Sequence, residues 1–361
     1  MPRPSRFIID LAHLEHNLTQ LSLLAGPRKT MAVVKANAYG HGALGCAKAL
    51  EDVINAFAVA LTEEAIALRE AGITKPILVL QGPHSSDDLT EIDHYGLWPA
   101  LSNRQQIHWL RDQTPDLEHV WLKVDTGMHR LGFDPHEVGE INTVLTAMGI
   151  QHITLMSHLA EAEDSDSILS HRQIQRWQNL LERNTGSTDG YPHASFSNSA
   201  GTVGQLSFEE SWVRLGYSLY GGSLVIPPPN LDLRPVMTFS SKVIATRWIE
   251  AGETVGYGGR WVAKRRSRIA TIPVGYGDGY PRSAADGTPI GTPYGTILLA
   301  GKVSMDMITA DITDKPDIEF GTEVTLWGDS PRIDEVATHC DTIGYELCTR
   351  ITDRTPRVFN R

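Results

Sequence analysis

Short runs of apolar and β-branched residues recur along the chain up to residue 218, and most are followed by a polar turn and a longer segment with apolar residues at three- and four-residue spacing. Segments 63–72, 103–113 and 171–184 have the spacing of amphipathic helices. The apolar runs are predicted strands, and they cover residues 30–35, 56–62, 76–82, 97–102, 119–127, 153–160, 193–199 and 212–218. Eight strand–helix units predict a TIM-type (β/α)8 barrel.

The pattern changes after the proline-rich segment IPPPN, which ends at Asn230. Glycine-bounded strand patterns such as 240–259 and 321–329 then dominate, with few helical stretches. We therefore expect two domains, a barrel over 1–230 and a mostly β-stranded domain over 231–361, with the first nine or so residues able to join the β domain. The alternative, a doubly wound sheet, would call for a GxGxxG fingerprint after the first strand, and none follows it.

Charge and cysteine content exclude several classes of partner. The net charge of −11 over 361 residues argues against nucleic acid and anionic membranes, which call for clustered Lys and Arg. The first apolar run is broken by Asp10 and His13, so no secretory segment is expected. Cys46, Cys340 and Cys348 show no metal-like spacing, which suits a reducing compartment. The sequence predicts a cytoplasmic protein without a bound metal.

Polar residues follow several of the predicted strands. In barrel enzymes the active site lies at the C-terminal ends of the strands. A single lysine at such a place is more often a surface residue whose aliphatic stem covers apolar neighbours. The convergence of several polar residues on one rim favours a site, and these residues are Lys35, Lys123, Arg130, His158, Ser199, Arg214 and Gly216.

Motifs along nearly the whole chain resemble those of the alanine racemases, which are fold type III pyridoxal-phosphate enzymes. The motifs stand in the family's order, and together they are highly specific. They are VVKANAYGHG (33–42), KVDTGMHRLGF (123–133), SHLA (157–160), SNSAG (197–201), WVRLGYSLYGG (212–222), GETVGYGGRW (252–261), PVGYGDGYPR (273–282) and GKVSMDM (301–307).

The resemblance implies that Lys35 holds pyridoxal 5'-phosphate as a Schiff base. Burial at the end of a strand lowers an amine's pKa, which both a nucleophile and a proton acceptor need. Racemisation removes the α-proton from one face and returns one to the other, so two bases are required. The resemblance assigns them to Lys35 and Tyr257. Because a phenol with an ordinary pKa of about 10 is a poor base at neutral pH, the site of Tyr257 needs nearby positive charge or hydrogen-bond donors.

The remaining cofactor contacts also follow from the resemblance. Tyr39, Ser199 and the backbone amides of Gly216 and Tyr217 are expected to bind the cofactor's phosphate. Arg214 is expected to face the pyridine nitrogen. Because a guanidinium cannot protonate that nitrogen, the ring would be a weaker electron sink and transamination would be disfavoured. His158 is expected to pack against the ring.

The resemblance implies that Arg130 binds the carboxylate of the substrate and that the backbone amide of Met305 assists. Tyr276 is expected at the substrate entrance. Lys123 has its side chain on the same strand face as Trp121, so it is expected to point into the barrel. The resemblance implies carbamylation of Lys123, which would turn a cation opposing Arg130 into a carboxylate that orients it.

Two aspartates near these residues are not expected to contact the cofactor or the substrate. Asp306 is expected to support its turn rather than to react. Asp353 stands where some members carry a tyrosine near the phosphate. Because an anion beside a phosphate is unfavourable, Asp353 is expected to turn away, toward Arg354.

The resemblance implies an isomerase that interconverts L-alanine and D-alanine and supplies D-alanine for peptidoglycan, and a homodimer with shared active sites. A broader racemase that acts on serine is the first alternative, because a pocket rejects a small added group by only about 1–3 kcal/mol. A barrel-type amino-acid decarboxylase is another, and Tyr257 as a second base argues against it. A single-barrel pyridoxal-phosphate carrier would lack the β domain.

Overall fold

The first part of the chain forms the predicted barrel. A computed structural model describes residues 3–164, 166–184, 193–206, 210–222 and 228–361. Its eight-stranded sheet has the order β8-β7-β6-β5-β4-β3-β2-β9, and the neighbouring strands are parallel. The strands are β2 (Lys29–Val33), β3 (Ala56–Val59), β4 (Ile77–Val79), β5 (Trp98–Leu101), β6 (His119–Lys123), β7 (His152–Met156), β8 (Ala194–Ser195) and β9 (Trp212–Leu215).

Backbone hydrogen bonds close the sheet between its outer strands, β8 and β9. The amide of Ser211 donates to the carbonyl of Ala194 at 2.9 Å, and the amide of Arg214 donates to the carbonyl of Ser197 at 3.1 Å. Each of the eight predicted runs overlaps one of the barrel strands, so the predicted fold class is confirmed.

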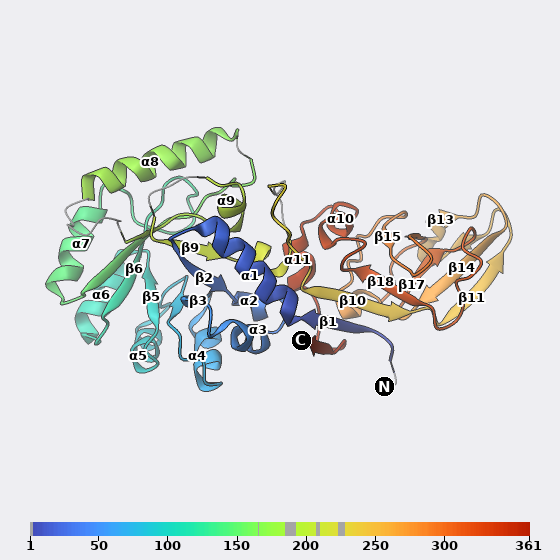
Figure 1. Cartoon of the computed structure of the whole chain (residues 1–361), viewed down its shortest axis with the longest axis horizontal. Helices are drawn as coiled ribbons and strands as arrows, with labels where there is room; N and C mark the ends of the chain where they lie inside the picture. The colour runs from blue at the N-terminus through green and yellow to red at the C-terminus, as the bar shows by residue number, and fades with distance from the viewer. Residues whose placement is uncertain (1–2, 165, 185–192, 207–209, 223–227) are drawn as a thin grey trace.

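Helices cover the outside of the barrel (Figure 1). On α8 the residues Gln173, Trp177, Leu180 and Leu181 are buried, which is the three- and four-residue spacing that predicted the helix. The helices that accompany the barrel are α1 (Leu11–Ala25), α2 (Lys35–Tyr39), α3 (Ala43–Leu50), α4 (Thr62–Glu70), α5 (Ser86–His94), α6 (Arg104–Gln113), α7 (Val138–Ala147), α8 (Ile168–Asn184), α9 (Ser199–Val203) and the 3-10 turn η1 (Tyr217–Tyr220).

Side chains point alternately to the two faces of each strand, so those inside the barrel lie in layers. His119, Trp121 and Lys123 share one face of β6, and Trp212 and Arg214 share one face of β9. The rings of Trp121 and Trp212 meet with centroids 5.7 Å apart. Lys123 and Arg214 both line a cavity at the C-terminal ends of the strands. An aromatic layer therefore closes the barrel beneath that cavity.

The rest of the chain is built mainly from antiparallel strands and extends away from the barrel along the long axis of the molecule (Figure 1). One sheet has the order β18-β10-β1-β19, a second has the order β11-β14-β17-β16-β15, and β12 pairs with β13. The strands are β1 (Arg6–Asp10), β10 (Met237–Lys242), β11 (Ala245–Ile249), β12 (Thr254–Val255), β13 (Trp261–Val262), β14 (Ser267–Ile272), β15 (Pro289–Ile290), β16 (Ile297–Leu299), β17 (Ile308–Asp311), β18 (Glu323–Trp327) and β19 (Arg357–Asn360), with 3-10 turns η2 (Tyr257–Gly259) and η3 (Tyr276–Asp278).

Both ends of the chain meet in one sheet of this β-rich part. Strand β1 pairs antiparallel with β10 and parallel with β19. The predicted boundary at 230/231 lies just after residues 226 and 227 of IPPPN, which are outside the described residues. Within the described ranges, no helix is long and apolar enough to cross a membrane.

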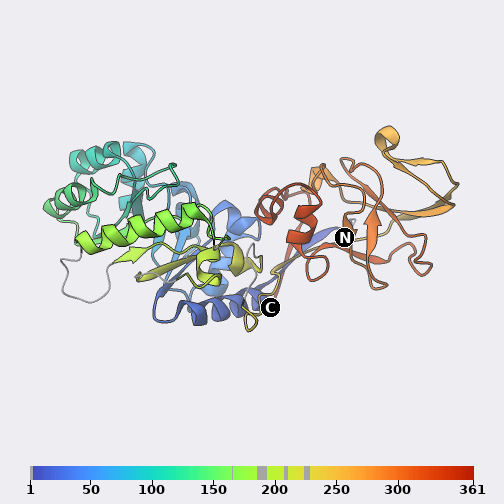
Figure 2. The ribbon, with the colours of Figure 1, turned by 90° about the horizontal axis from the view of Figure 1, so that it is seen from above.

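Two short helices of the β-rich part, α10 (Ile333–Thr338) and α11 (Gly344–Thr349), lie beside the barrel (Figures 1 and 2). The contact is close, because a Cβ at Gly40 would lie 2.0 Å from the carbonyl oxygen of Cys348. The hydroxyl of Tyr217 also donates to Asp334 Oδ1 at 2.5 Å. The C-terminal segment therefore forms one wall beside the barrel mouth.

Candidate active site

A cavity of about 780 Å³ opens at the C-terminal end of the barrel strands. It brings together nine of the residues that the sequence predicted for the site: Lys35, Tyr39, Lys123, Arg130, His158, Ser199, Arg214, Gly216 and Tyr217. The other three, Tyr257, Tyr276 and Met305, belong to the β-rich part and are not among the described residues that line this cavity.

Lys35 follows β2 and begins the short turn α2, whose backbone is left-handed. The φ angles of Ala36, Asn37, Ala38 and Tyr39 lie between 50° and 55°. Such a run is disfavoured for residues with a Cβ, and it persists only where surrounding contacts impose it. The turn places both Lys35 and Tyr39 in the lining of the cavity.

Four cationic side chains line the cavity: Lys35, Lys123, Arg130 and Arg214. Burial, followed by the charge of Arg130, lowers the pKa of the Lys35 amine below its usual range. Burial, followed by the charges of Arg214 and Arg130, lowers the pKa of Lys123 to about 7. No described carboxylate forms an ion pair with Lys123. The cavity therefore favours an anionic ligand and holds nucleophilic amines.

Arg214 lies at the base of the cavity and is only 4 % exposed. Its Nη1 donates to the carbonyl of Ser195 at 3.0 Å, and its Nη2 donates to the carbonyl of Ser157 at 2.6 Å. Nη2 also lies 3.4 Å from Nδ1 of His158. Burial, followed by the charge of Arg214, holds the pKa of His158 well below its usual range. The pair thus presents a fixed guanidinium beside a neutral imidazole.

Backbone amides and hydroxyls form a polar cradle where β9 ends. Ser199 Oγ accepts hydrogen bonds from the amides of Gly216 at 2.8 Å and Ser218 at 3.4 Å. A Cβ at Gly216 would lie 2.7 Å from the hydroxyl of Tyr39, so only glycine leaves this space free. Such donors at the end of the last barrel strand suit a phosphate group. With the cations above, the residues present fit pyridoxal phosphate.

Helix α11 contributes a wall of the cavity that no sequence motif predicted. The ring of Tyr345 stacks on Tyr217 with centroids 3.9 Å apart and lies 5.9 Å from Tyr39. Burial raises the pKa of Tyr345 to about 12, so it stays a neutral phenol. Ile343 and Glu346 line the same wall. None of the motifs given above includes these residues. Tyr345 and Glu346 lie in segment 344–359, which also holds Asp353, and Ile343 directly precedes that segment.

Asp353 turns away from the cavity, but not toward the predicted partner. Its side chain is 94 % exposed and pairs with Arg357 at 2.8 Å. The expected pairing with Arg354 is wrong, because Arg354 pairs with Asp306 at 2.7 Å and approaches the buried Asp278. Asp306 is therefore held in an ion pair beside its own turn.

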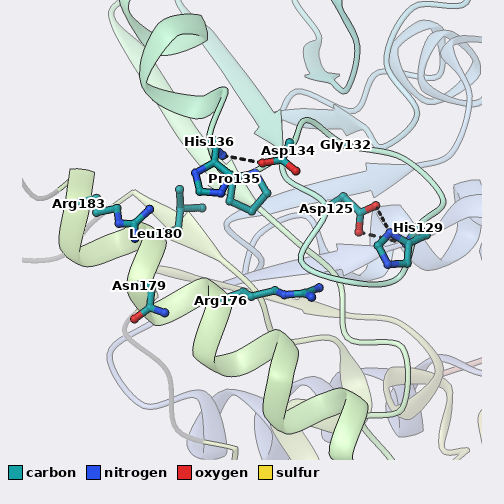
Figure 3. A pocket seen from close by; sticks show the side chains of 10 residues that line it. All are labelled: Asp125, His129, Gly132, Asp134, Pro135, His136, Arg176, Asn179, Leu180 and Arg183. Atoms are coloured by element: carbon teal, nitrogen blue, oxygen red, sulfur yellow. Dashed lines mark hydrogen bonds and ion pairs between the residues drawn. The ribbon is translucent and has the colours of Figure 1, made fainter.

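The loop after β6 carries Arg130, and its outer surface borders a second cavity, of about 570 Å³, against α8 (Figure 3). The carboxylate of Asp125 accepts from the amides of Gly127 at 2.9 Å and His129 at 3.1 Å. A Cβ at Gly132 would lie 2.6 Å from the amide of Asp125. These contacts fold the loop tightly, and Arg130 lines the mouth cavity. In the described ranges, no cluster of three metal-ligating side chains occurs.

The three predicted residues of the β-rich part are exposed. Tyr257 is 72 % exposed, Met305 51 % and Tyr276 38 %. Tyr276 and Met305 lie together, because the amide of Gly277 donates to the carbonyl of Met305 at 2.9 Å. Tyr257 lies in a turn that also contains Gly258, and Gly258 has a φ of 71°.

Comparisons with known proteins agree with this architecture. The chain matches the alanine racemase N-terminal domain over residues 9–224 and the alanine racemase C-terminal domain over residues 236–359. It is 44 % identical to the alanine racemase of Chromohalobacter salexigens, over 99 % of this chain and 98 % of that protein. It is 40 % identical to the alanine racemase of Alteromonas mediterranea, over 99 % of both chains.

Solved structures give the same result. The biosynthetic alanine racemase of Pseudomonas aeruginosa superposes with a TM-score of 0.93 at 36 % identity, covering 99 % of this chain and 100 % of that one. The alanine racemase of Bartonella henselae with covalently bound pyridoxal phosphate has a TM-score of 0.88 at 30 % identity, with the same coverage. With both domains matched in order and at full length, the chain belongs to the alanine racemase family.

Proposed function

We propose that this protein interconverts L-alanine and D-alanine with pyridoxal 5'-phosphate and two bases, Lys35 and Tyr257. The observation that carries the proposal is the half-buried Lys35 side chain, whose lowered amine pKa and place among Lys123, Arg130 and Arg214 suit a covalent partner for an anionic aldehyde cofactor. The family membership supports both the reaction and the cofactor.

The cofactor, when bound, supplies an electron sink that acidifies the α-hydrogen of the substrate. Its phosphate would be held by Tyr39, Ser199 and the amides of Gly216 and Tyr217. Its ring would pack against His158, and its pyridine nitrogen would face Arg214. Because the contacts of Arg214 with carbonyls fix its position, it can accompany the nitrogen without protonating it.

The substrate carboxylate would bind Arg130, with the amide of Met305 assisting and Tyr276 at the entrance. Lys123 lines the same cavity as Arg130, and the two side chains repel each other while both are cations. The pKa of about 7 leaves part of the Lys123 amine neutral at physiological pH, and a neutral amine can react with carbon dioxide. Carbamylation would turn Lys123 into an anion that orients Arg130.

Tyr257 would act from a second copy of the chain. The phenol is 72 % exposed in the β-rich part, whereas Lys35 lies in the barrel cavity. In a two-fold dimer the β-rich part of one copy would cover the barrel mouth of the other, and each site would take Lys35 from one copy and Tyr257 from its partner. Lys35 Nζ and Tyr257 Oη would then move protons on opposite faces of the α-carbon.

The proposal extends to organisation and cellular role. The units are a barrel over 1–230 and a β domain over 231–361, and pairing of β1 with β10 and β19 supports counting the first residues with the β domain. The protein would act in the cytoplasm and supply D-alanine for peptidoglycan. The matches to both domains favour racemisation over the decarboxylase and over the single-barrel carrier.

Chiral analysis of the products from a panel of L-amino acids tests this function. We expect alanine to reach a mixture of both enantiomers, with serine slower. Amine and carbon dioxide as products would identify a decarboxylase instead. Serine turnover equal to that of alanine would favour the broader racemase.

A further inference from the structure

The left-handed turn after β2 needs support from outside itself. Ala36, Asn37, Ala38 and Tyr39 all have φ near 50°, a conformation that residues with a Cβ visit singly rather than in runs. Because Lys35 begins this turn, anything that imposes the turn also sets where the Lys35 amine points.

Contacts along the turn are spread over its length. Asn37 Oδ1 accepts from the amide of Ala43 at 2.7 Å. His41 Nδ1 lies 2.9 Å from the carbonyls of both Ala38 and Tyr39. These three contacts hold the part of the turn that is farther from Lys35.

Glu64 holds the near end. Its Oε1 accepts from the amide of Ala36, the residue next to Lys35, at 2.6 Å. Its Oε2 accepts from the amides of Ala60 at 2.8 Å and Leu61 at 3.2 Å. Glu64 is the third residue of α4, so one carboxylate ties the start of the turn to the loop between β3 and α4.

The same carboxylate acts on the charge of Lys35. The groups that face Lys35 are Arg130 from the loop after β6, Arg214 from β9, His158 after β7 and Glu64 from α4. The two arginines lower the pKa of the amine, and Glu64 raises it. Glu64 is the anion that faces Lys35 within the described structure.

We propose that Glu64 is a positioning residue for the reaction, which fixes the left-handed turn through Ala36 and thereby aims the Lys35 amine into the cavity. The proposal rests on the function proposed for Lys35. It deepens that function, since nothing in the family resemblance assigned a role to this side chain.

Glu64→Gln in the full-length holoenzyme tests the proposal. The carboxamide keeps one acceptor but turns an N–H₂ toward the amides on its other side, so a hydrogen bond to a charged acceptor is lost. Hydrogen exchange followed by mass spectrometry should show faster exchange in segment 34–43, by on the order of tenfold. Glu63→Gln, which removes an exposed carboxylate from the same helix turn, is the matched control and should exchange like the native protein.

A spectroscopic readout separates this role from simple support of the fold. Loss of the Glu64 charge should lower the pKa of the Lys35 nitrogen, so the yellow colour of the protonated Lys35–cofactor link should fade at a pH lower by on the order of one unit. Glu64→Asp keeps the charge but is one methylene shorter. Glu64→Asp should show faster hydrogen exchange in segment 34–43, while its colour should change near the same pH as in the native protein. If Glu64→Gln fails to fold, the hydrogen exchange of Glu64→Asp still tests the proposal.

Exchange and colour change in Glu64→Gln that both match Glu63→Gln would overturn the role of Glu64. Borohydride fixation of the cofactor in the same samples distinguishes this failure from that of the proposed function. If the cofactor is fixed to Lys35, only the role of Glu64 is lost. If it is fixed to another lysine, the proposed function fails, and the role of Glu64 fails with it.

Discussion

The barrel mouth and the β-rich part differ in how far their predicted site residues are buried. At the mouth, Arg214 is 4 % exposed and Tyr217 is 2 % exposed, and both line one cavity. In the β-rich part, Tyr257 is 72 % exposed and Met305 is 51 % exposed. One chain thus gathers its predicted barrel residues around one cavity by itself, while the predicted residues of the β-rich part are exposed.

The difference follows from what each half must do. Four cations around one cavity repel one another and lose hydration, so this half is stable when an anionic ligand compensates them. Large side chains exposed on a glycine-rich turn gain free energy when a second surface covers them. The mouth is therefore preorganised for a cofactor, and the β-rich surface is suited to docking.

The largest effect is expected from the barrel half. Lys35→Ala removes the covalent anchor and one base, so racemisation should fall by more than about 10⁴-fold. Borohydride reduction of the native enzyme, followed by peptide mapping, should place the cofactor on Lys35. Lys48→Ala, at an exposed position of α3, should remain active. Cofactor fixed to any other lysine contradicts the assignment.

In the β-rich half, Tyr257→Phe should lower racemisation by roughly 10²–10⁴-fold, the usual contribution of a general base. One-sided chemistry should survive, because Lys35 still serves one face. In deuterated water the variant should exchange the α-hydrogen of one alanine enantiomer much faster than that of the other. Tyr294→Phe alters another exposed tyrosine of this half and is the control. Equal residual exchange of both enantiomers would count against a face-specific Tyr257.

Gly216→Ala tests whether the mouth is shaped for a phosphate. The new Cβ would lie 2.7 Å from the Tyr39 hydroxyl and would crowd the cradle. The affinity for pyridoxal phosphate, measured by its retention on dilution, should fall by about tenfold or more, because an extra methyl group in a filled space is destabilising. Gly139→Ala adds a Cβ to α7 where no atom lies within 4 Å, and should bind normally. If Gly216→Ala retains pyridoxal phosphate as well as the native protein does, the phosphate does not bind beside Gly216.

The smallest effect concerns the layer beneath the mouth. Burial, followed by the charges of His152 and His193, lowers the pKa of His119 to about 4 in the folded chain. The unfolded chain therefore binds this proton first, and stability falls as the pH drops from 6.5 toward 4. His119→Gln should reduce that pH-dependent loss in thermal unfolding by up to about 3 kcal/mol. Parallel pH curves for the two proteins would contradict this.

The sequence was most informative where burial and periodicity agree. Strands such as β3 and β4 are buried along their whole length, so they appear in the sequence as continuous apolar runs. The C-terminal ends of parallel strands meet at one rim, and this explains why strand order alone was enough to group Lys123, His158 and Arg214.

Other features depend on contacts that local patterns do not encode. The left-handed turn after Lys35 opposes the intrinsic preference of its alanines, and distant atoms impose it. Tyr345 lines the cavity because α11, which lies near the end of the sequence, packs against barrel residues that are far from it in sequence. Asp353 pairs with Arg357, the first residue of β19, whereas its neighbour Arg354 is engaged by Asp306.

The central claim is that each site takes Lys35 from one chain and Tyr257 from its partner, and mixing two inactive variants tests it most directly. Lys35→Ala and Tyr257→Phe homodimers are each expected to be inactive, since every site lacks one base. After joint denaturation and refolding, half of the dimers should be mixed, and each mixed dimer should have one intact site and one doubly altered site. Activity should then return to about a quarter of the native value. If heterodimers form, as verified by mass, and the mixture stays inactive, each chain builds its own site and the claim is wrong.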